Sequence, residues 1–149
     1  MDCMRYRPGI GAVVYRITDQ GPRFLIFHRI KNWEGWEMLK GGIADGETEM
    51  ESLEREIKEE TGLKDYQIIK KTGKVIKYEW PKEFVKDQHI YFGAEHTFYL
   101  VKANDDKINI DTREHDDYKW VTKEEALKLL TYNNHKRVLE HVIEHGDIK

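Results

Sequence analysis

Three glutamates in the middle of the chain are spaced so that together they could bind cations. Glu56, Glu59 and Glu60 stand at positions i, i+3 and i+4, so on a helix their carboxylates share one face. Like charges this close repel one another and raise one another's pKa. Mg²⁺ and Mn²⁺ prefer oxygen ligands, bridge to phosphates and would remove that penalty. The spacing therefore predicts a divalent metal site and, through it, a phosphate-containing substrate.

The glutamates lie in residues 48–61, a segment that is predicted to be helical. Gly62 follows at the position where helices commonly end in a left-handed residue. Met50, Leu53 and Ile57 form a neighbouring apolar stripe, which we expect to pack onto a sheet. The helix thus has one face for the core and another for metal ions.

A glutamate-rich helix alone is more often a solvated surface, so the surrounding pattern decides the interpretation. Residues 41–63 fill nine defining positions in 23 residues, a match expected by chance on the order of once in a million from residue frequencies. The pattern is that of the Nudix box, and the chain resembles the Nudix family of phosphate-cleaving hydrolases. The nine positions are Gly41, Glu47, Arg55, Glu56, Ile57, Glu59, Glu60, Gly62 and Leu63.

The resemblance implies a metal-dependent mechanism. Glu56, Glu59 and Glu60 would bind two or three Mg²⁺ or Mn²⁺ ions, with the carbonyl oxygen of Gly41 as a further ligand. Glu59 would orient or deprotonate the attacking water. Glu114 falls where related enzymes carry another carboxylate, as a ligand or an aid to the base; an ordinary loop carboxylate is the alternative.

The resemblance also implies a structural role for two residues of the box. Glu47 would pair with Arg55 and brace the glycine-rich loop against the helix. That loop, residues 40–47, could offer backbone N–H groups to an anion at the helix N-terminus, although glycine-rich turns are more often only turns.

Several cations are candidates for phosphate binding. Arg7, Arg29 and Lys40 could reach phosphate oxygens, Arg through a forked contact and Lys as a point charge. Ordinary surface charge is the alternative for each, and it is weakest for Lys40, which adjoins the box. Lys82 and Lys86 could hold distal phosphates, although solvated loop lysines are the commoner case.

Two tyrosines are candidates for stacking on a nucleobase. Tyr78 and Tyr118 could each contribute roughly 1–3 kcal/mol by stacking, with core packing as an equal alternative. The remaining tryptophans of interest are expected in the core or at its rim, and three histidines receive no role. These residues are Trp33, Trp36, Trp120, His28, His89 and His96.

Length and composition favour a single enzyme domain spanning residues 1–149. The net charge of −3 argues against general coating of nucleic acid but allows capture of one phosphorylated end. Cys3 is the only cysteine, so no disulfide framework forms within one chain. No segment is long and apolar enough to span a membrane, and we expect a cytoplasmic location.

The elements that must position these residues alternate between strands and helices, which favours an α/β fold with a mixed sheet flanked by helices. The resemblance implies the Nudix α/β/α sandwich. Strands are predicted at residues 11–17, 24–28, 67–78, 90–101 and 117–121, and further helices at residues 122–130 and 134–145. Thr122 is the predicted N-cap of its helix, with Glu125 as its capping-box partner.

The segments before and after the box narrow the choice of substrate. Residues 6–11 resemble the start of bacterial RNA 5′-pyrophosphohydrolases and plant dinucleoside-polyphosphate hydrolases, and residues 113–120 resemble asymmetric diadenosine tetraphosphate hydrolases. In length and composition, residues 81–96 resemble the RNA 5′-pyrophosphohydrolases more than the diadenosine tetraphosphate hydrolases. Leu39 departs from the pattern, because many members have Pro there.

The first hypothesis from these flanks is asymmetric cleavage of diadenosine tetraphosphate to ATP and AMP. The alternative is removal of pyrophosphate from an RNA 5′ end. A nucleoside-triphosphate pyrophosphatase ranks below both. A catalytically silent nucleotide-binding module is the hypothesis from another class, and the intact box carboxylates argue against it.

Overall fold

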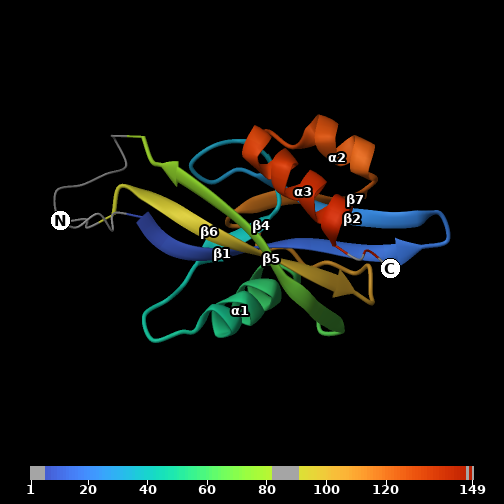
Figure 1. Ribbon diagram of the computed structural model, residues 1–149, viewed down its shortest axis with the longest axis horizontal. Helices are drawn as coiled ribbons and strands as arrows, with labels where there is room; N and C mark the ends of the chain where they lie inside the picture. The colour runs from blue at the N-terminus through green and yellow to red at the C-terminus, as the bar shows by residue number, and fades with distance from the viewer. Residues whose placement is uncertain (1–5, 82–90, 147, 149) are drawn as a thin grey trace.

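The computed structural model describes residues 6–81, 91–146 and 148 (Figure 1). Lys82, Lys86 and His89 therefore lie outside the described residues. In chain order the elements are β1 (Tyr6–Thr18), β2 (Gly21–Arg29), β3 (Gly35–Glu37), β4 (Leu39–Gly42), α1 (Glu49–Thr61), β5 (Tyr66–Glu79), β6 (Gly93–Ala103), β7 (His115–Val121), α2 (Lys123–Leu129) and α3 (Asn133–His145).

The strands form one mixed sheet covered on both faces. Its main path runs β3-β2-β1-β6-β5, while β4 pairs with β1 and β7 pairs with β2. The β1–β6 pairing is parallel and the other strand pairings are antiparallel. Helix α1 covers one face, and α2 and α3 cover the other (Figure 1). This arrangement confirms the predicted α/β/α sandwich.

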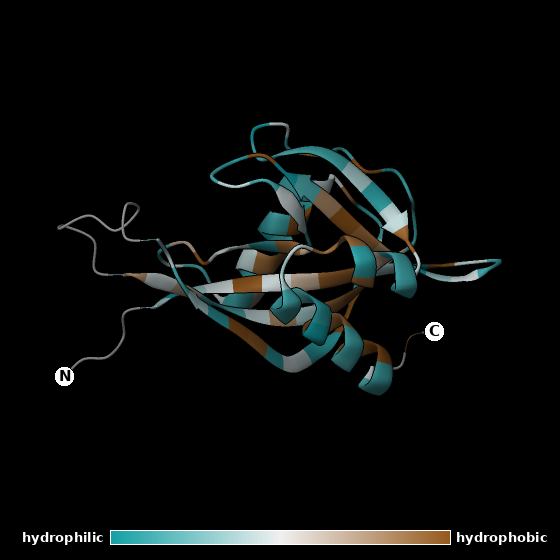
Figure 2. Ribbon diagram, turned by 90° about the horizontal axis from the view of Figure 1, so that it is seen from above, coloured by the Kyte–Doolittle hydropathy of each residue, from teal (hydrophilic) through white to brown (hydrophobic). Residues whose placement is uncertain are grey.

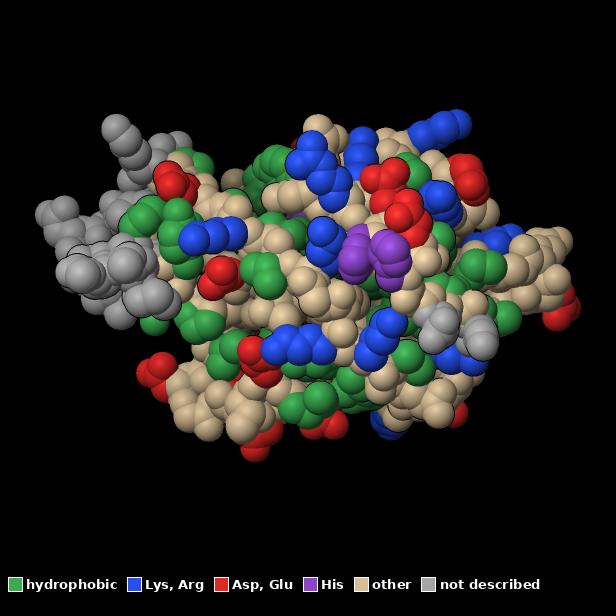
Figure 3. Space-filling model, viewed as in Figure 1, with side chains coloured by type: hydrophobic (Ala, Val, Ile, Leu, Met, Phe, Trp, Pro, Cys, Tyr) green, Lys and Arg blue, Asp and Glu red, His purple; other side chains and the backbone are tan. Residues whose placement is uncertain are grey.

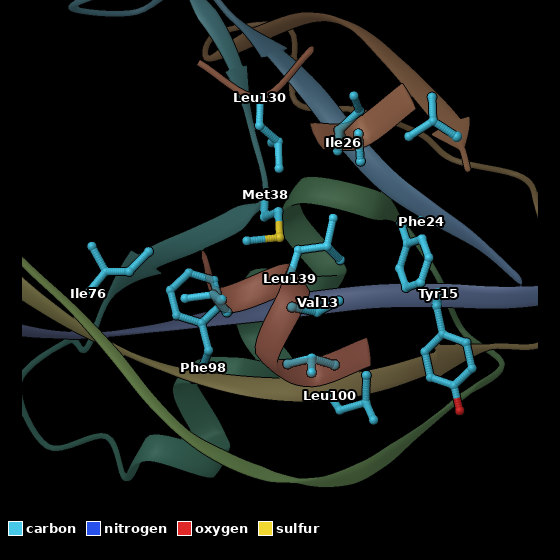
Figure 4. Close-up of a cluster of buried hydrophobic side chains, with 14 residues drawn as sticks. Val13, Tyr15, Phe24, Ile26, Met38, Ile76, Phe98, Leu100, Leu130 and Leu139 are labelled. Carbon is cyan, nitrogen blue, oxygen red and sulfur yellow. The ribbon is translucent and has the colours of Figure 1, made fainter. Parts of the chain in front are cut away.

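The central strand β1 is buried on both faces, which explains its continuous apolar run. Val13 and Tyr15 point into the cluster beneath α2 and α3, which Figure 4 shows around Leu139. Ala12 and Val14 belong to the cluster beneath α1. Side chains of a strand alternate between faces, so one strand contributes to both cores. Figure 2 shows hydrophobic residues on the strands of the sheet, with hydrophilic bands between them on several strands.

Helix α1 has the predicted ends. Thr48 caps its N-terminus and forms a capping box with Glu51, while Gly62 ends it in the left-handed region at φ +68°. Leu53 is fully buried, as predicted. The prediction for Met50 was wrong, because its side chain is 41% exposed.

The buried side of the first turn of α1 is taken by Ser52 instead. The hydroxyl of Ser52 donates to the carbonyl oxygen of Gly42 over 3.2 Å. Met50 lies in the same turn and is exposed to solvent.

The other predicted elements are present with shifted bounds. Strands β1, β2 and β7 are longer than predicted, and β3 and β4 were not predicted as strands at all. Residue 90, the predicted start of β6, lies outside the described residues. Thr122 caps α2 together with Glu125, as predicted. Within the described residues, no helix has the length and apolar content to cross a membrane.

Candidate active site

A cavity of about 890 Å³ is lined by residues of the box, of the sheet and of α3. Strands β1, β2, β4 and β5, helix α1 and the residue before β7 each supply part of its wall. Many of the predicted site residues meet there. Those lining it are Arg7, Arg29, Lys40, Gly41, Arg55, Glu56, Tyr78 and Glu114.

The three box glutamates differ in burial. Glu56 and Glu60 are 7% and 3% exposed, whereas the side chain of Glu59 is 50% exposed. Arg55 contacts Glu56 over 2.9 Å and Glu59 over 3.2 Å. Burial raises the pKa of Glu56 to about 7; Arg55 opposes this shift, and the charges of Glu60 and Glu59 add to it. The predicted ligand face is therefore partly buried and electrostatically unfavourable without a cation.

Glu60 faces two carboxylates from the loop before β7. Oxygens of Glu60, Asp111 and Glu114 lie within 4.8 Å of one another. Burial, and then the hydrogen bond and charge of Glu60, raise the pKa of Glu114. Asp111 was missed in the sequence. Its spacing three residues before Glu114 was the available signal.

These residues fit a hard divalent cation. The potential ligands of the cluster are oxygens, as Mg²⁺ and Mn²⁺ prefer. Glu60 Oε1 is buried and has no hydrogen-bond partner within the described part of the chain. The His115 imidazole lies 3.2 Å from this oxygen but makes no hydrogen bond to it, so a bound cation would compensate a buried carboxylate that is incompletely satisfied. Glu60, Glu114 and Asp111 could hold one ion, and Glu56 and Glu59 stand beside them on α1.

The predicted brace between the loop and α1 is present. Arg55 Nε donates to Glu47 Oε2 over 2.7 Å, and Nη2 donates to Glu47 Oε1 over 3.0 Å. Nη2 also donates to the carbonyl oxygen of Gly42 over 3.0 Å. The bonds from Arg55, and then from the backbone of Ala44, lower the pKa of Glu47 to about 2. Arg55 thus fixes the loop and two of the carboxylates at once.

Two glycines make room for charged side chains. A Cβ on Gly41 would collide with the carboxylate of Glu56, and one on Gly42 would collide with the guanidinium of Arg7. Gly41 thereby allows its backbone to lie directly beside a predicted metal ligand. The role of the Gly41 carbonyl oxygen as a ligand stays a prediction.

Two predicted phosphate-binding cations converge on one buried carboxylate. Arg29 Nη1 lies 2.9 Å from Glu37 Oε2, and Lys40 Nζ lies 3.7 Å from Glu37 Oε1. Arg29 Nη1 also lies 3.7 Å from Glu114. Glu37 thus holds both cations, and Arg29 also lies beside Glu114 of the carboxylate cluster.

Glu37 and His115 form a buried pair that the sequence reasoning missed. His115 Nε2 lies 2.8 Å from Glu37 Oε2, and His115 Nδ1 lies 3.2 Å from Glu60 Oε1. Burial favours neutral His115, but Glu37 and Glu60 outweigh it and raise its pKa to about 9. Burial opposes ionisation of Glu37 too, yet His115, Lys40 and Arg29 lower its pKa to about 2. The sequence offered one indication of this pair, because Glu37 is a charged residue between the hydrophobic residues Trp36 and Met38.

The two tyrosines occupy different places. Tyr78 lines the cavity, stacks on His96 with ring centroids 5.7 Å apart, and accepts a hydrogen bond from Lys40 Nζ over 3.2 Å. Tyr118 packs against the cluster beneath α1 and is not among the described residues that line the cavity. Packing, the alternative to stacking, is what the structure shows for Tyr118.

The three tryptophans predicted in the core or at its rim, and the histidines left without a role, lie in different places. Trp33 lines the cavity beside Tyr132, with ring centroids 4.9 Å apart. Trp36 packs against the cluster beneath α2 and α3, and Trp120 against the one beneath α1. His28 Nδ1 lies 2.6 Å from Asp116 Oδ1. On the face seen in Figure 3, charged side chains of both signs are interspersed.

Comparison with known proteins identifies relatives along nearly the whole chain. The family model for the NUDIX domain matches residues 5–142. An RNA pyrophosphohydrolase from a Nitratiruptor species is 33% identical, with 98% of this chain and 99% of the relative covered. An RNA pyrophosphohydrolase from Campylobacter jejuni is 30% identical, with 96% of both chains covered.

Solved structures share the fold. A binary complex of the C. elegans Ap4A hydrolase superposes with a TM-score of 0.76 at 24% identity, covering 93% of this chain and 96% of that one. The E. coli dihydroneopterin triphosphate pyrophosphohydrolase superposes with a TM-score of 0.75 at 20% identity, covering 95% and 99%.

Proposed function

The chain belongs to the NUDIX family, and from this premise we propose that it removes pyrophosphate from the 5′ end of triphosphorylated RNA. That it is a Nudix hydrolase follows from the family; the substrate is the proposal. The observation that carries it is the match to relatives named RNA pyrophosphohydrolase, which extends over 98% of this chain and 99% of the first relative.

The site agrees with a polyphosphate substrate. Arg7, Arg29 and Lys40 lie on the cavity wall together with Glu56 and Glu114, so cations for phosphate oxygens stand near the proposed metal ligands. A volume of about 890 Å³ is within the range of known ligand sites. An RNA substrate also agrees with the cytoplasmic location, which stays a prediction from the sequence.

Asymmetric cleavage of diadenosine tetraphosphate is the second candidate. Residues 113–120 favour it, since they resemble the matching segment of such hydrolases. The sequence alone favours this reaction over the RNA reaction. It is the second candidate because the curated relatives at 30–33% identity are named for the RNA reaction.

The proposed roles follow from position and chemistry. When bound, Mg²⁺ or Mn²⁺, in two or three ions, would polarise phosphoryl oxygens and acidify water. Glu56, Glu60 and Glu114 would act as ligands. Glu59 would take the proton of the attacking water as that oxygen bonds to phosphorus and the bridging P–O bond breaks. Arg29 and Lys40 would bind phosphate oxygens.

The test is a direct comparison of substrates. The purified protein with Mg²⁺, and separately with Mn²⁺, is incubated with a 5′-triphosphorylated RNA, diadenosine tetraphosphate and a panel of nucleoside triphosphates. The same RNA with a 5′-monophosphate serves as the matched control. We expect kcat/KM to be at least about tenfold higher for triphosphorylated RNA, which corresponds to about 1.4 kcal/mol in transition-state binding. A preference for diadenosine tetraphosphate would select the second candidate, and comparable values for all substrates would refute both.

A further inference from the structure

A buried carboxylate joins the two halves of the site. Glu37, the last residue of β3, is 1% exposed and has three cationic neighbours. Arg29 and Lys40 approach it from the phosphate side, at 2.9 and 3.7 Å. His115 approaches it from the metal side, at 2.8 Å. Glu37 is therefore the common contact of the proposed phosphate-binding cations and of a histidine beside the metal ligands.

His115 extends this contact to Glu60. Its side chain is 5% exposed, and its ring lies 4.9 Å from that of Phe27. Nε2 faces Glu37, while Nδ1 lies 3.2 Å from Glu60 Oε1. The Nδ1 and Oε1 atoms are close enough for an ion pair but not aligned as a hydrogen bond, and neither has another partner within the described residues. The imidazole thus stands between two buried carboxylates.

Stability alone does not explain such an arrangement. Replacing a buried ion pair by well-packed apolar residues of similar volume is often neutral or stabilising. Groups that hold metal ligands in place, by contrast, commonly contribute about 10- to 100-fold to metal affinity or activity. The position of His115 against Glu60 Oε1, at the carboxylate cluster, favours this second role.

We propose that Glu37 and His115 are positioning residues that hold Glu60 in place for a divalent cation. The inference rests on the proposed function, since it takes Glu60 as a metal ligand. Glu37 fixes the imidazole from one side, and the imidazole fixes the Glu60 carboxylate from the other. The same Glu37 contacts Arg29 and Lys40, so one carboxylate connects the proposed phosphate-binding cations with the side chain that holds Glu60.

The test separates the two nitrogens of the imidazole. In His115→Asn the amide nitrogen takes a place near that of Nδ1, and in His115→Gln it takes a place near that of Nε2. His115→Phe fills the volume beside Phe27 without either donor. Glu37→Gln keeps the shape of the carboxylate but removes its charge. His141→Phe, at a part-buried histidine of α3 that is not among the described residues lining the cavity, is the matched control.

The readout is Mn²⁺ affinity without substrate, measured by calorimetry and by the EPR signal of free Mn²⁺. We expect the Kd to rise at least about tenfold in His115→Phe and His115→Gln, which lose the nitrogen facing Glu60. We expect a smaller rise, about threefold, in His115→Asn and Glu37→Gln, which change only the contact with Glu37. His141→Phe should bind Mn²⁺ like the wild type. Circular dichroism and thermal unfolding in EDTA identify any variant that fails to fold, and the remaining variants still decide the outcome.

The outcomes distinguish this inference from the proposed function. Wild-type Mn²⁺ affinity in folded His115→Phe and His115→Gln would overturn the positioning role, because packing alone would then account for His115. Equal losses in the Asn and Gln variants would overturn the assignment of Nδ1 to Glu60. A wild-type protein that neither binds Mn²⁺ nor cleaves any phosphoanhydride would overturn the proposed function itself, and this inference with it.

Discussion

Glu59 is the box glutamate that is most exposed to solvent, and its role as the base stays a prediction. Its side chain is 50% exposed and contacts Arg55 over 3.2 Å, whereas Glu56 and Glu60 are buried. Exposure leaves it able to meet water. It also means that removing its charge disturbs little of the fold, since surface substitutions usually change stability by no more than about 0.5 kcal/mol.

We therefore predict that Glu59→Gln lowers kcat by about 100-fold or more while the free energy of unfolding stays within about 0.5 kcal/mol of the wild type. Steady-state kinetics and urea denaturation measure the two quantities. Glu54→Gln, an exposed position on the same helix, is the control and should keep wild-type kcat. Near-wild-type turnover in Glu59→Gln would move the role of base to Glu114.

Arg55 depends on its forked shape rather than on its charge alone. It donates to Glu47, Glu56 and Glu59 and to the backbone of Gly42. A lysine ammonium lacks the planar fork that spans these acceptors.

Arg55→Lys should lower the free energy of unfolding by about 2 kcal/mol, the scale of one or two lost charged hydrogen bonds, and should lower kcat as the loop loosens. Urea denaturation measures the first effect and steady-state kinetics the second. Arg23→Lys, whose contacts stay within the β1–β2 turn, should change stability by no more than about 0.5 kcal/mol. An equal loss of stability in Arg55→Lys and Arg23→Lys would show that the forked guanidinium of Arg55 has no special role.

Separation along the chain decides which site residues could be found from the sequence. The members of the box lie within 23 residues, so their spacing is visible in the chain. Glu37, Glu60 and His115 come from β3, α1 and β7, and only the pairing of distant strands brings them together. Asp111 reaches the cluster for the same reason.

At the scale of elements, local chemistry determines what can be predicted. Thr48 and Gly62 bound α1, and Thr122 starts α2, because capping depends on residues within one turn. Strands β3 and β4 have three and four residues, too few to establish a period of two. They exist because β1 and β2 offer them free edges.

The two capping boxes allow a matched comparison. Thr48→Ala and Thr122→Ala should each lower the free energy of unfolding by about 1 kcal/mol, because each removes an N-cap hydrogen bond. Only Thr48→Ala should also lower kcat/KM, since α1 carries the box glutamates and α2 supplies no described residue of the cavity wall. Urea denaturation and kinetics provide the two readouts. Equal kinetic effects in both variants would show that lost stability, not the position of α1, causes the loss.

At the scale of the whole molecule, the site depends on a sheet with two covered faces. Strand β1 forms the centre of both cores and places Arg7 at the cavity wall, while β2 places Arg29 there. The apolar runs of these strands predicted burial, and the alternation of strands and helices predicted the layers. The strand order was not accessible, because it depends on which distant segments pair, including the parallel β1–β6 contact.

The cavity also has a wall of neutral histidines, which links stability to pH. Burial, then the positive charge of Lys40, lowers the pKa of His135 to about 4, with Glu37 opposing. Burial, then Lys40, lowers the pKa of His96 to about 3. Both are buried, so the folded protein resists protonation that the unfolded chain accepts below its ordinary pKa of about 6.5.

The sign follows from linkage. Above pH 6.5 both states hold these histidines neutral, so their contribution to stability is fully present. As the pH falls from 6.5 towards 4, the unfolded chain takes up protons first and stability is lost. At pH 5 the loss from His135 should be about 2 kcal/mol, since one pKa unit corresponds to about 1.4 kcal/mol.

We predict that His135→Phe loses about 2 kcal/mol less stability than the wild type between pH 7.5 and pH 5, measured by urea denaturation at both values. His145→Gln, at an exposed histidine of the same helix, is the control and should keep the wild-type difference. The expected difference arises because phenylalanine fills the buried site beside Phe98 and Tyr132 without offering a nitrogen to protonate. An identical loss in the wild type and in His135→Phe would mean that other groups cause the acid destabilisation.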